Sequence, residues 1–423
     1  MRYDAVLFDL DGTLTESEPG ITSSIRYAIE RLGLPAPDEA TLRTLIGPPL
    51  MEGLMNLGLE EATAREGVRI YRERFSVEGW CDNSVYTGIP ALLRTLKARG
   101  VYVALATAKP EKFARMILEH FGIARYFDKV SAVRMDQMHA DKADLIRDAL
   151  PPGAVRAAMV GDRLYDMRGA KACGVEAIGV LYGYGSREEL ESAGADYVAG
   201  TVRDLTGYLL GDEPLARGAF ITMEGMDGSG KTTQIDMLAG WLRKCGHEVD
   251  VTREPGGCPI SEAIRQILLA AEENGLTDAA EMLLFAAARA QHVSDRILPA
   301  LAAGRLVLCD RFEDSSVAFQ GGGRELGEEL VRAVNAPAKQ GLEPDITVLL
   351  ALAPELSIAR RRERGAMDRI EQQDAGFHGR VHDAYIRLAG RNPQRVILID
   401  ASREVGEIAQ TVCGRVMERL NAW

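Results

Sequence analysis

The chain has 423 residues, of which 46% are hydrophobic and 26% charged, and its formal net charge is −12. At roughly 100–200 residues per domain, this length predicts two or three domains, and the composition excludes a disordered chain, a collagen and a disulfide scaffold. The acidic balance argues against non-specific binding of DNA or RNA, although a local basic pocket for a nucleotide remains compatible with it.

The sequence also lacks the patterns of membrane and secreted proteins. No apolar stretch approaches the roughly 18 residues that a membrane span needs. The first apolar run is interrupted by Asp4, Asp9 and Asp11, which is not the pattern of a signal peptide. The six cysteines are scattered without a CxxC pair, which is typical of reduced thiols in a long chain. We therefore expect a cytoplasmic protein with neither membrane nor nucleic-acid partners.

Both halves of the chain open with a short apolar strand that runs into a polar loop and then a helical pattern. The first strand is expected at Ala5–Phe8 and its counterpart at Phe220–Met223. Further apolar strands are expected at Tyr102–Ala106, Ala157–Val160, Ala177–Val180, Leu306–Cys309, Ile346–Leu350 and Val396–Ile399. Strand–helix alternation predicts an α/β protein with doubly wound parallel sheets, in which ligands bind at the carboxyl ends of strands.

The joint between the halves is expected near residue 213. The segment 211–218 is short and polar, and it is punctuated by Gly and Pro. We therefore predict domains at residues 1–213 and 214–423, each long enough to bury a core of its own.

The first half carries polar residues suited to phosphoryl transfer. Asp9 and Asp11 follow the first strand at i and i+2, so that one carboxylate can attack phosphorus while the other protonates the leaving oxygen. The alternative for this pair alone is a polar turn that caps a helix. Thr107 after a later strand and Lys142 at a helix start can contact a phosphoryl group. Asp162 and Asp166 offer carboxylates for Mg²⁺, a hard cation that prefers oxygen ligands.

This series, DxDGT, a strand-end Thr, a Lys and GDxxxD, resembles the haloacid dehalogenase-like phosphatase superfamily over about residues 2–210. The run at 160–186 is similar to its phosphoglycolate phosphatase and 5′-nucleotidase-like branch. The resemblance implies a Rossmann-like domain whose helical cap, at about residues 15–85, closes over a small phosphomonoester. It further implies an Asp9 nucleophile, an Asp11 general acid and base, phosphate stabilisation by Thr107 and Lys142, and Mg²⁺ bound by Asp9, Asp11, Asp162 and Asp166.

The second half carries a phosphate-binding loop. Residues 225–232 fit GxxxxGK[ST] and lie between an expected strand and the helical stretch Thr232–Lys244. Backbone N–H groups and the helix N-terminus favour phosphate there, Lys231 reaches the β- and γ-phosphates, and Thr232 can hold Mg²⁺. The predicted ATP-binding residues in the loop are Gly225, Gly228, Ser229, Gly230, Lys231, Thr232 and Thr233.

Residues after the loop include a cation and an aromatic–arginine pair that could serve a phosphorylated acceptor with a flat base. Arg311 follows a strand and supplies a cation for a monophosphate, with Arg253 a second candidate. Phe285 and Arg289 are four residues apart and share a helix face, where they can stack on a base and hydrogen-bond its edge. Core packing is the alternative for Phe285 taken alone.

The order and spacing of these motifs closely resemble thymidylate kinase over about residues 218–420. This likeness implies a P-loop nucleoside monophosphate kinase domain, ATP and dTMP as substrates, and a homodimer formed through this half. It places Asp227 near the sugar 3′-hydroxyl, Phe285 and Arg289 on thymine, and Gln320 nearby. Phe319 stands where Tyr is frequent, which weakens the expected sensing of the sugar 2′ position.

The run Arg360–Arg364 would ordinarily be a solvated helix face. The variable positions of the phosphate loop hold no arginine, so an arginine that stabilises the transition state must come from elsewhere. The bacterial type of the family places it in a lid over ATP. We expect Arg364 in that catalytic role, with Arg360 and Arg369 assisting.

Together these observations predict a bifunctional enzyme. One half would convert dTMP to dTDP with ATP, and the other would hydrolyse a phosphomonoester through an aspartyl-phosphate, with Mg²⁺ as cofactor. The alternatives are a thymidylate kinase with a non-catalytic docking domain and a nucleoside monophosphate kinase with another acceptor. Efficient hydrolysis of dTMP would oppose the fused kinase, so we expect dTMP to be a poor phosphatase substrate.

Overall fold

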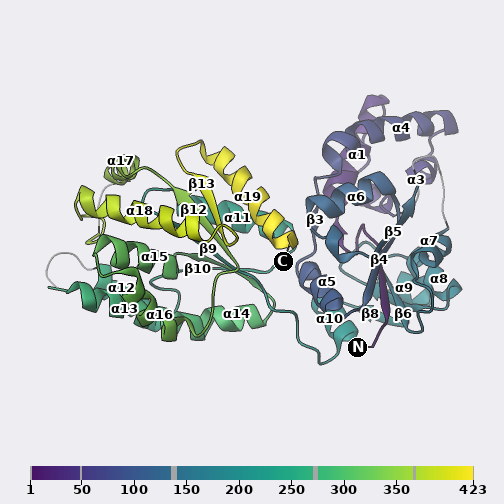
Figure 1. The fold of residues 1–423 in the computed structure, drawn as a ribbon. Helices are drawn as coiled ribbons and strands as arrows, with labels where there is room; N and C mark the ends of the chain where they lie inside the picture. Colours follow the sequence, from purple (N-terminus) through teal and green to yellow (C-terminus); the bar gives the residue numbers. More distant parts are fainter. Residues whose placement is uncertain (1, 48–49, 135–140, 270–274, 365–367, 423) are drawn as a thin grey trace. The chain divides into compact units, whose positions relative to one another are not determined.

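The computed structural model describes residues 2–47, 50–134, 141–269, 275–364 and 368–422. Contacts divide the chain into two compact units, and each contains a parallel sheet with helices packed against it (Figure 1). The first unit runs to Leu215 and includes Lys244–His247, and the second holds Ala216–Arg243 and the residues from Glu248 onward. The predicted α/β class with two parallel sheets is confirmed.

The first unit is built on a six-stranded sheet with the strand order β5-β4-β1-β6-β7-β8, and every neighbouring pair is parallel. Its strands are β1 (Ala5–Phe8), β4 (Tyr102–Pro110), β5 (Lys129–Val133), β6 (Ala157–Gly161), β7 (Glu176–Val180) and β8 (Tyr197–Ala199). All four residues of β1 are buried, as expected for a central parallel strand covered on both faces.

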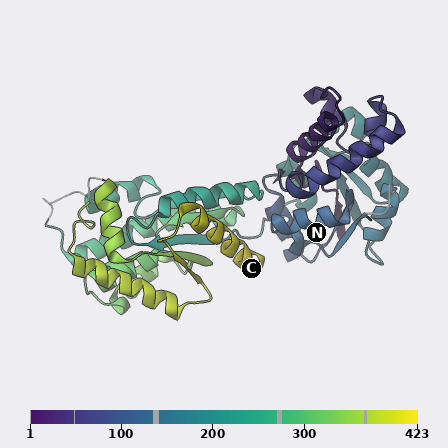
Figure 2. The same ribbon diagram turned by 90° about the horizontal axis from the view of Figure 1, so that it is seen from above.

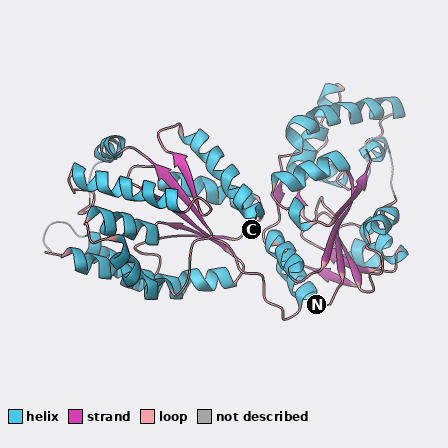
Figure 3. Ribbon diagram, viewed as in Figure 1, coloured by secondary structure: helices cyan, strands magenta, loops and turns pink. Residues whose placement is uncertain are grey.

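Helices cover this sheet and complete its core, which joins strand residues such as Leu7 and Met159 to Ile146 and Leu190. Figure 3 shows the magenta strands of the unit flanked by cyan helices. The helices are α5 (Ile89–Ala98), α6 (Glu111–His120), η2 (Ala124–Tyr126), α7 (Lys142–Ala149), α8 (Leu164–Ala172), α9 (Arg187–Ser192) and α10 (Val202–Leu210).

A helical subdomain is inserted after β1. Its helices are α1 (Glu18–Arg31), α2 (Glu39–Thr44), α3 (Leu50–Asn56), α4 (Glu61–Arg74) and η1 (Phe75–Gly79), and the antiparallel pair β2 (Thr15–Glu16) and β3 (Ser84–Val85) brackets them. In Figure 2 these helices are purple to indigo and lie together at one side of their unit. Ile21, Ile25 and Ile29 recur every four residues of α1 and are buried, which gives the insertion a core of its own.

The second unit is built on a five-stranded parallel sheet with the order β10-β11-β9-β12-β13. Its strands are β9 (Phe220–Gly225), β10 (Val249–Arg253), β11 (Leu306–Asp310), β12 (Ile346–Ala351) and β13 (Val396–Asp400). Residues of β9 such as Ile221 and Met223 pack with Leu308, Val348 and Leu238 in one hydrophobic cluster.

The helices of this unit surround the sheet (Figure 1). They are α11 (Lys231–Lys244), α12 (Pro259–Leu269), α13 (Asp278–His292), η3 (Val293–Ile297), α14 (Leu298–Ala302), α15 (Glu313–Ser316), η4 (Val317–Gly323), α16 (Glu328–Lys339), α17 (Pro354–Arg364), α18 (Ala375–Arg391) and α19 (Val405–Ala422). No helix within the described residues has the length and apolar character needed to cross a membrane.

Candidate active sites

In the first unit, the parallel register brings separate motifs to one edge of the sheet. Phe8 at the end of β1 pairs with Leu105 of β4 and Val160 of β6. The backbone N–H of Asp9 continues this alignment by donating to the carbonyl of Val160 at 2.9 Å. Because the carboxyl ends of these strands coincide, Asp9 and Asp162 leave the sheet side by side.

Three carboxylates form a cluster at this edge. Asp9, Asp162 and Asp166 offer oxygen atoms that all lie within 4.8 Å of one another. The fully buried Asp162 accepts hydrogen bonds from the backbone N–H of Tyr184 at 2.8 Å and from Thr13 Oγ1 at 3.3 Å. Carboxylate oxygens are the donors that Mg²⁺ prefers, so these residues fit such an ion. When bound, it would supply positive charge to a phosphoryl group at this edge.

Lys142 bridges two members of this cluster. Its Nζ lies 2.7 Å from Asp9 Oδ1 and 2.6 Å from Asp166 Oδ1, and all three side chains are largely buried. Burial alone would lower the pKa of Lys142, but the carboxylates of Asp166 and Asp9 outweigh it and raise the pKa. Burial raises the pKa of Asp9 to about 6 although Lys142 opposes the shift. One lysine therefore leaves the excess negative charge of the cluster only partly neutralised.

The side chain of Asp11 lies apart from this cluster. Both of its carboxylate oxygens accept hydrogen bonds from Lys109 Nζ at 2.8 Å. This lysine is 5% exposed, and its Nζ also lies 4.9 Å from the ring centroid of Phe75 in η1. The structure therefore places the predicted general acid against a buried cation, and the assigned Mg²⁺ contact of the Asp11 side chain is not seen within the described cluster. Lys109 was not predicted from the sequence, although it stands at i+2 from Thr107.

Thr107 lies in β4 and is almost fully buried. Its Oγ1 accepts a hydrogen bond from the backbone N–H of Lys109 at 3.2 Å. The hydroxyl proton of Thr107 is not used in that bond, so it can be donated to a phosphate oxygen. This geometry is compatible with the predicted role of Thr107, which stays a prediction.

The cluster depends on a glycine beside each motif. A Cβ on Gly161 would lie 2.2 Å from Asp166 Cγ, and a Cβ on Gly12 would lie 2.2 Å from Asp162 Oδ2. Gly12 also has φ +80°, a region that L side chains rarely adopt. The spacing GDxxxD therefore works because Gly161 lets the helix residue Asp166 fold back against the strand end.

In the second unit, the phosphate loop connects β9 to α11. Gly225, Gly228 and Gly230 have φ values of +139°, +80° and +89°, which only glycine adopts without strain. A Cβ on Gly225 would lie 2.5 Å from the carbonyl oxygen of Leu350. Thr232 and Thr233 are exposed in the first turn of α11, where the helix N-terminus favours an anion.

Two side chains of the loop are suited to a phosphate group. The buried Oγ of Ser229 has no hydrogen-bond partner among the described residues. Lys231 is 7% exposed and donates from Nζ to the carbonyls of Gly225 at 3.1 Å and Met226 at 3.0 Å. Burial and the nearby Arg311 lower the pKa of Lys231. A phosphate would supply negative charge close to this ammonium. The loop therefore fits the phosphates of ATP.

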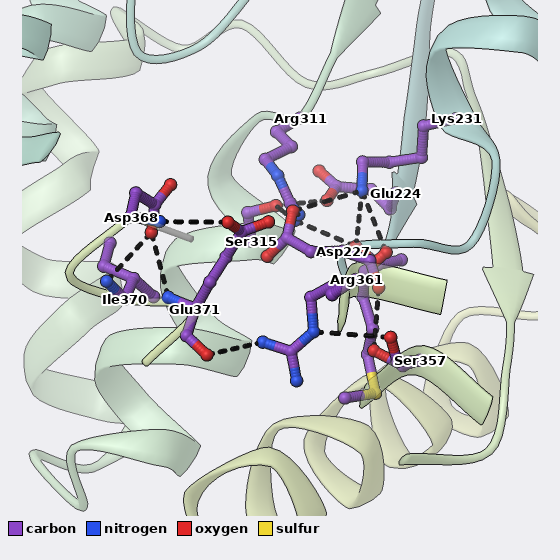
Figure 4. A network of polar contacts seen from close by, with 12 residues as sticks. Glu224, Asp227, Lys231, Arg311, Ser315, Ser357, Arg361, Asp368, Ile370 and Glu371 are labelled. Atoms are coloured by element: carbon purple, nitrogen blue, oxygen red, sulfur yellow. Dashed lines mark hydrogen bonds and ion pairs between the residues drawn. The ribbon is translucent and has the colours of Figure 1, made fainter. Parts of the chain in front are cut away.

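Arg311 contacts the phosphate loop (Figure 4) and also lines a neighbouring cavity. Its Nη2 lies 2.6 Å from Asp227 Oδ1, and its Nη1 donates to the Gly225 carbonyl at 2.9 Å and to Ser315 Oγ at 3.0 Å. Burial alone would raise the pKa of Asp227, but Arg311 and Lys231 lower it. Arg311 has φ +71°, an uncommon conformation for a residue with a side chain. Strain of this kind concentrates at functional sites.

Most of the predicted acceptor residues line this cavity. Asp227, Phe285, Arg289, Arg311 and Gln320 are all found in its wall. Arg289 is 2% exposed, and its Nε donates to Glu254 Oε2 at 2.8 Å while its Nη1 donates to Ser316 Oγ at 3.1 Å. Ser316 also lines the cavity and was missed by the sequence analysis.

The structure does not bring Arg253 to the cavity wall. Its guanidinium instead pairs with Glu262 at 2.9 Å, and Arg265 from α12 lines the cavity. A charged residue at a strand end was the only sequence signal for Arg253, and that signal does not fix where a long side chain turns. Its role at the acceptor stays a prediction.

The arginine run of α17 divides into different environments. Arg360 Nη1 donates to the carbonyls of Ala401 at 3.1 Å and Gly228 at 3.4 Å, so it touches the phosphate loop. Arg361 is buried and donates to the Glu371 carbonyl at 2.7 Å (Figure 4). The side chain of Arg364, the predicted catalytic arginine, lies outside the described residues.

The second unit matches known kinases along nearly all of their length. The family model for thymidylate kinase matches residues 223–412. The thymidylate kinase of Pelobacter propionicus is 46% identical over 211 residues, which cover 48% of this chain and 96% of that relative. The thymidylate kinase of Deinococcus radiodurans is 45% identical over 207 residues, or 48% of this chain and 99% of that relative. The chain belongs to the thymidylate kinase family.

The first unit matches a second family. The model for haloacid dehalogenase-like hydrolases matches residues 6–180. A solved structure of a predicted phosphatase from Clostridium acetobutylicum is 41% identical, covers 50% of this chain and 99% of its own, and has a TM-score of 0.47. Both predicted resemblances are confirmed, and the protein joins a haloacid dehalogenase-like hydrolase domain to a thymidylate kinase domain.

Substitution of Gly161 by alanine tests the packing of the carboxylate cluster. The added Cβ would displace Asp166, so we expect Mg²⁺-dependent phosphatase activity of Gly161→Ala to fall about tenfold or more. Gly207→Ala is the matched control, because nothing lies within 4 Å of its Cβ position in α10. Steady-state hydrolysis of p-nitrophenyl phosphate measures both. Full activity in Gly161→Ala would contradict the packing argument.

Proposed function

We propose that the kinase domain transfers the γ-phosphoryl group of ATP to dTMP. A phosphate oxygen of dTMP attacks the γ-phosphorus, the bond to the β-phosphate oxygen breaks, and dTDP and ADP leave. The observation that carries this proposal is the position of Arg311, which contacts both the phosphate loop and the wall of the cavity that Phe285 and Arg289 line. Lys231 and Arg360 at the loop supply further positive charge for the transferred group.

We propose that the hydrolase domain cleaves a small phosphomonoester in two steps. A carboxylate oxygen of Asp9 attacks phosphorus, and the ester oxygen leaves with a proton from Asp11. Water then attacks the aspartyl-phosphate and gives a proton to Asp11, which releases inorganic phosphate. Lys142 supports the assignment because its Nζ lies 2.7 Å from the attacking carboxylate. Asp9, Asp162 and Asp166 would hold Mg²⁺ in this domain, and Thr232 in the kinase domain.

The tests below can also give two alternative results. The hydrolase domain would be a docking module if its carboxylate cluster supported no turnover. The kinase would serve another acceptor if a different monophosphate were used more efficiently than dTMP. The proposal also includes a homodimer formed through the kinase domain and a cytoplasmic location, both of which follow from the family.

Replacement of Asp9 by asparagine tests the phosphatase. The amide is a poor nucleophile, so we expect Asp9→Asn to lower p-nitrophenyl phosphate hydrolysis by about 10³-fold or more while the kinase rate is unchanged. Asp4→Asn is the matched control, since Asp4 lies just before β1 in an exposed pair with Arg156. Equal Mg²⁺-dependent turnover in wild type and Asp9→Asn would remove the nucleophile assignment. An absence of turnover in the wild type would favour the docking module.

An acceptor panel with ATP tests the kinase. We expect dTMP to have the highest kcat/KM among dTMP, dUMP, dCMP and UMP, and Arg311→Met to reduce the dTMP value by about 100-fold because it removes charged hydrogen bonds. Arg415→Met is the control, because Arg415 pairs only loosely with Glu418 on α19, at 3.4 Å. A preference for UMP or dCMP would reassign the acceptor.

The two activities must not form a futile cycle. We therefore expect the hydrolase domain to turn over dTMP far more slowly than its preferred phosphomonoester. A substrate panel that includes dTMP and 2-phosphoglycolate, measured as release of inorganic phosphate without ATP, compares them. Rapid dTMP hydrolysis at micromolar concentration would contradict this expectation.

A further inference from the structure

A buried carboxylate stands beside the acceptor cavity without lining it. Glu281 lies in the first turn of α13, and its side chain is 1% exposed. It accepts hydrogen bonds from Gln320 Nε2 at 2.9 Å, Arg324 Nη2 at 3.0 Å and Arg369 Nη2 at 2.5 Å. Gln320 and Arg324 lie in and just after η4, whereas Arg369 lies beyond α17. Glu281 therefore contacts two segments that are distant in the sequence.

The charge of Glu281 fixes the direction of these hydrogen bonds. Burial alone would raise the pKa of Glu281, but the hydrogen bonds from Gln320, Arg324 and Arg369 lower it. An ionised carboxylate accepts hydrogen bonds and has none to donate. The carboxamide of Gln320 must therefore turn its NH₂ group toward Glu281, because the opposite orientation would set two acceptors against each other.

This orientation decides which end of Gln320 is available to a ligand. Gln320 is 1% exposed and lines the cavity together with Phe285 and Arg289. Phe285 follows Glu281 by four residues on α13 and Arg289 follows by eight, so all three share one helix face. Within the described part of the chain, no hydrogen bond reaches Gln320 Oε1. The cavity therefore combines an acceptor, Gln320 Oε1, with a guanidinium that only donates.

We propose that Glu281 is a positioning residue that sets base specificity by holding Gln320 with its Oε1 toward the bound base. The inference rests on the proposed use of a pyrimidine monophosphate by this cavity. A thymine or uracil edge presents a ring N–H beside a carbonyl, which matches Oε1 and the Arg289 guanidinium. A cytosine edge presents a ring nitrogen acceptor beside an amino group, so it would place acceptor against acceptor and donor against donor.

A site that hydrogen-bonds one edge rejects the mismatched edge because its buried groups are left unpaired. Glu281 contributes to this rejection without touching the base, since it removes the freedom of Gln320 to rotate its amide. Arg324 and Arg369 balance the buried charge of Glu281. Without that orientation, Gln320 could present either its amide nitrogen or its oxygen, and only the mismatch at Arg289 would remain against a cytosine edge.

The experiment compares dTMP with 5-methyl-dCMP as acceptors for the full-length protein and ATP. These nucleotides share the methyl group, the sugar and the phosphate, and they differ only at the edge in question. Glu281→Gln retains the size of the side chain but can donate as well as accept, which frees Gln320 to rotate. We expect the ratio of kcat/KM for dTMP over 5-methyl-dCMP to fall about tenfold or more in Glu281→Gln.

Arg369→Gln is the matched control, because it removes one cation from Glu281 and leaves the hydrogen bond to Gln320 in place. Both kcat/KM values are expected to fall together in this variant, with their ratio kept within about threefold. Gln320→Met removes the carboxamide while leaving Glu281 paired with its arginines, and the ratio should fall in it as in Glu281→Gln. Thermal melting would show whether Glu281→Gln folds. If it does not, Gln320→Met alone tests whether Gln320 sets the base specificity.

An unchanged ratio in Gln320→Met, or an equal fall of the ratio in Arg369→Gln, would overturn the inference. The wild type separates this result from the proposed function. If it fails to phosphorylate dTMP, the proposed kinase activity is wrong. If it phosphorylates dTMP and the ratio does not move in the variants, only the role of Glu281 is wrong.

Discussion

The ion pair between Arg311 and Asp227 holds the kinase site together. The two side chains meet at 2.6 Å, and Arg311 also reaches the carbonyl of Gly225 at the start of the phosphate loop. Neither β9 nor β11 would place these groups alone, but the parallel pairing of the two strands carries them to the same edge. The positive φ of Arg311 is the backbone distortion that accompanies this contact.

The same physical arrangement recurs in the hydrolase domain with the charges reversed. There the carboxylates of Asp9, Asp162 and Asp166 surround the single ammonium of Lys142. Buried like charges are tolerated only with a partner, so this domain calls for a further cation when a phosphate ester approaches. The kinase loop faces the opposite requirement, because Lys231 and Arg311 share one carboxylate and have capacity left for an anion.

The sequence was sufficient to predict the framework and most of the motif residues. Central strands such as β1 and β9 are buried along their whole length because both of their faces are covered, and each ends at a motif. The strands β5 and β10 lie at sheet edges and escaped prediction. In β10 the residues Asp250 and Arg253 break the apolar pattern, and most of the strand is only half-buried.

Residues that act through a partner could not be found in the same way. Lys109 and Glu281 belong to no recognised motif, and the role of each depends on what it contacts elsewhere in its own domain. The direction of the Arg253 side chain could not be predicted for a related reason, since Glu262 lies nine residues away and pairs with its guanidinium. Spacing along a chain predicts which backbone positions share an edge, whereas the direction of a long charged side chain depends on the nearest opposite charge.

The opposite charge of the two sites bears on how one chain can hold a kinase and a phosphatase. Both must recognise a phosphate monoester dianion, so neither can exclude the other's substrate by charge alone. Discrimination must come from the part of the substrate beyond the phosphate. In the proposed kinase reaction, the base would contact the cavity wall that Phe285, Arg289 and Gln320 form. In the proposed hydrolase reaction, that part of the substrate would contact the helical insertion. Phe75 of this insertion contacts Lys109, which in turn donates hydrogen bonds to Asp11. Separate selection by these two surfaces would allow opposed phosphoryl chemistry to coexist in one polypeptide.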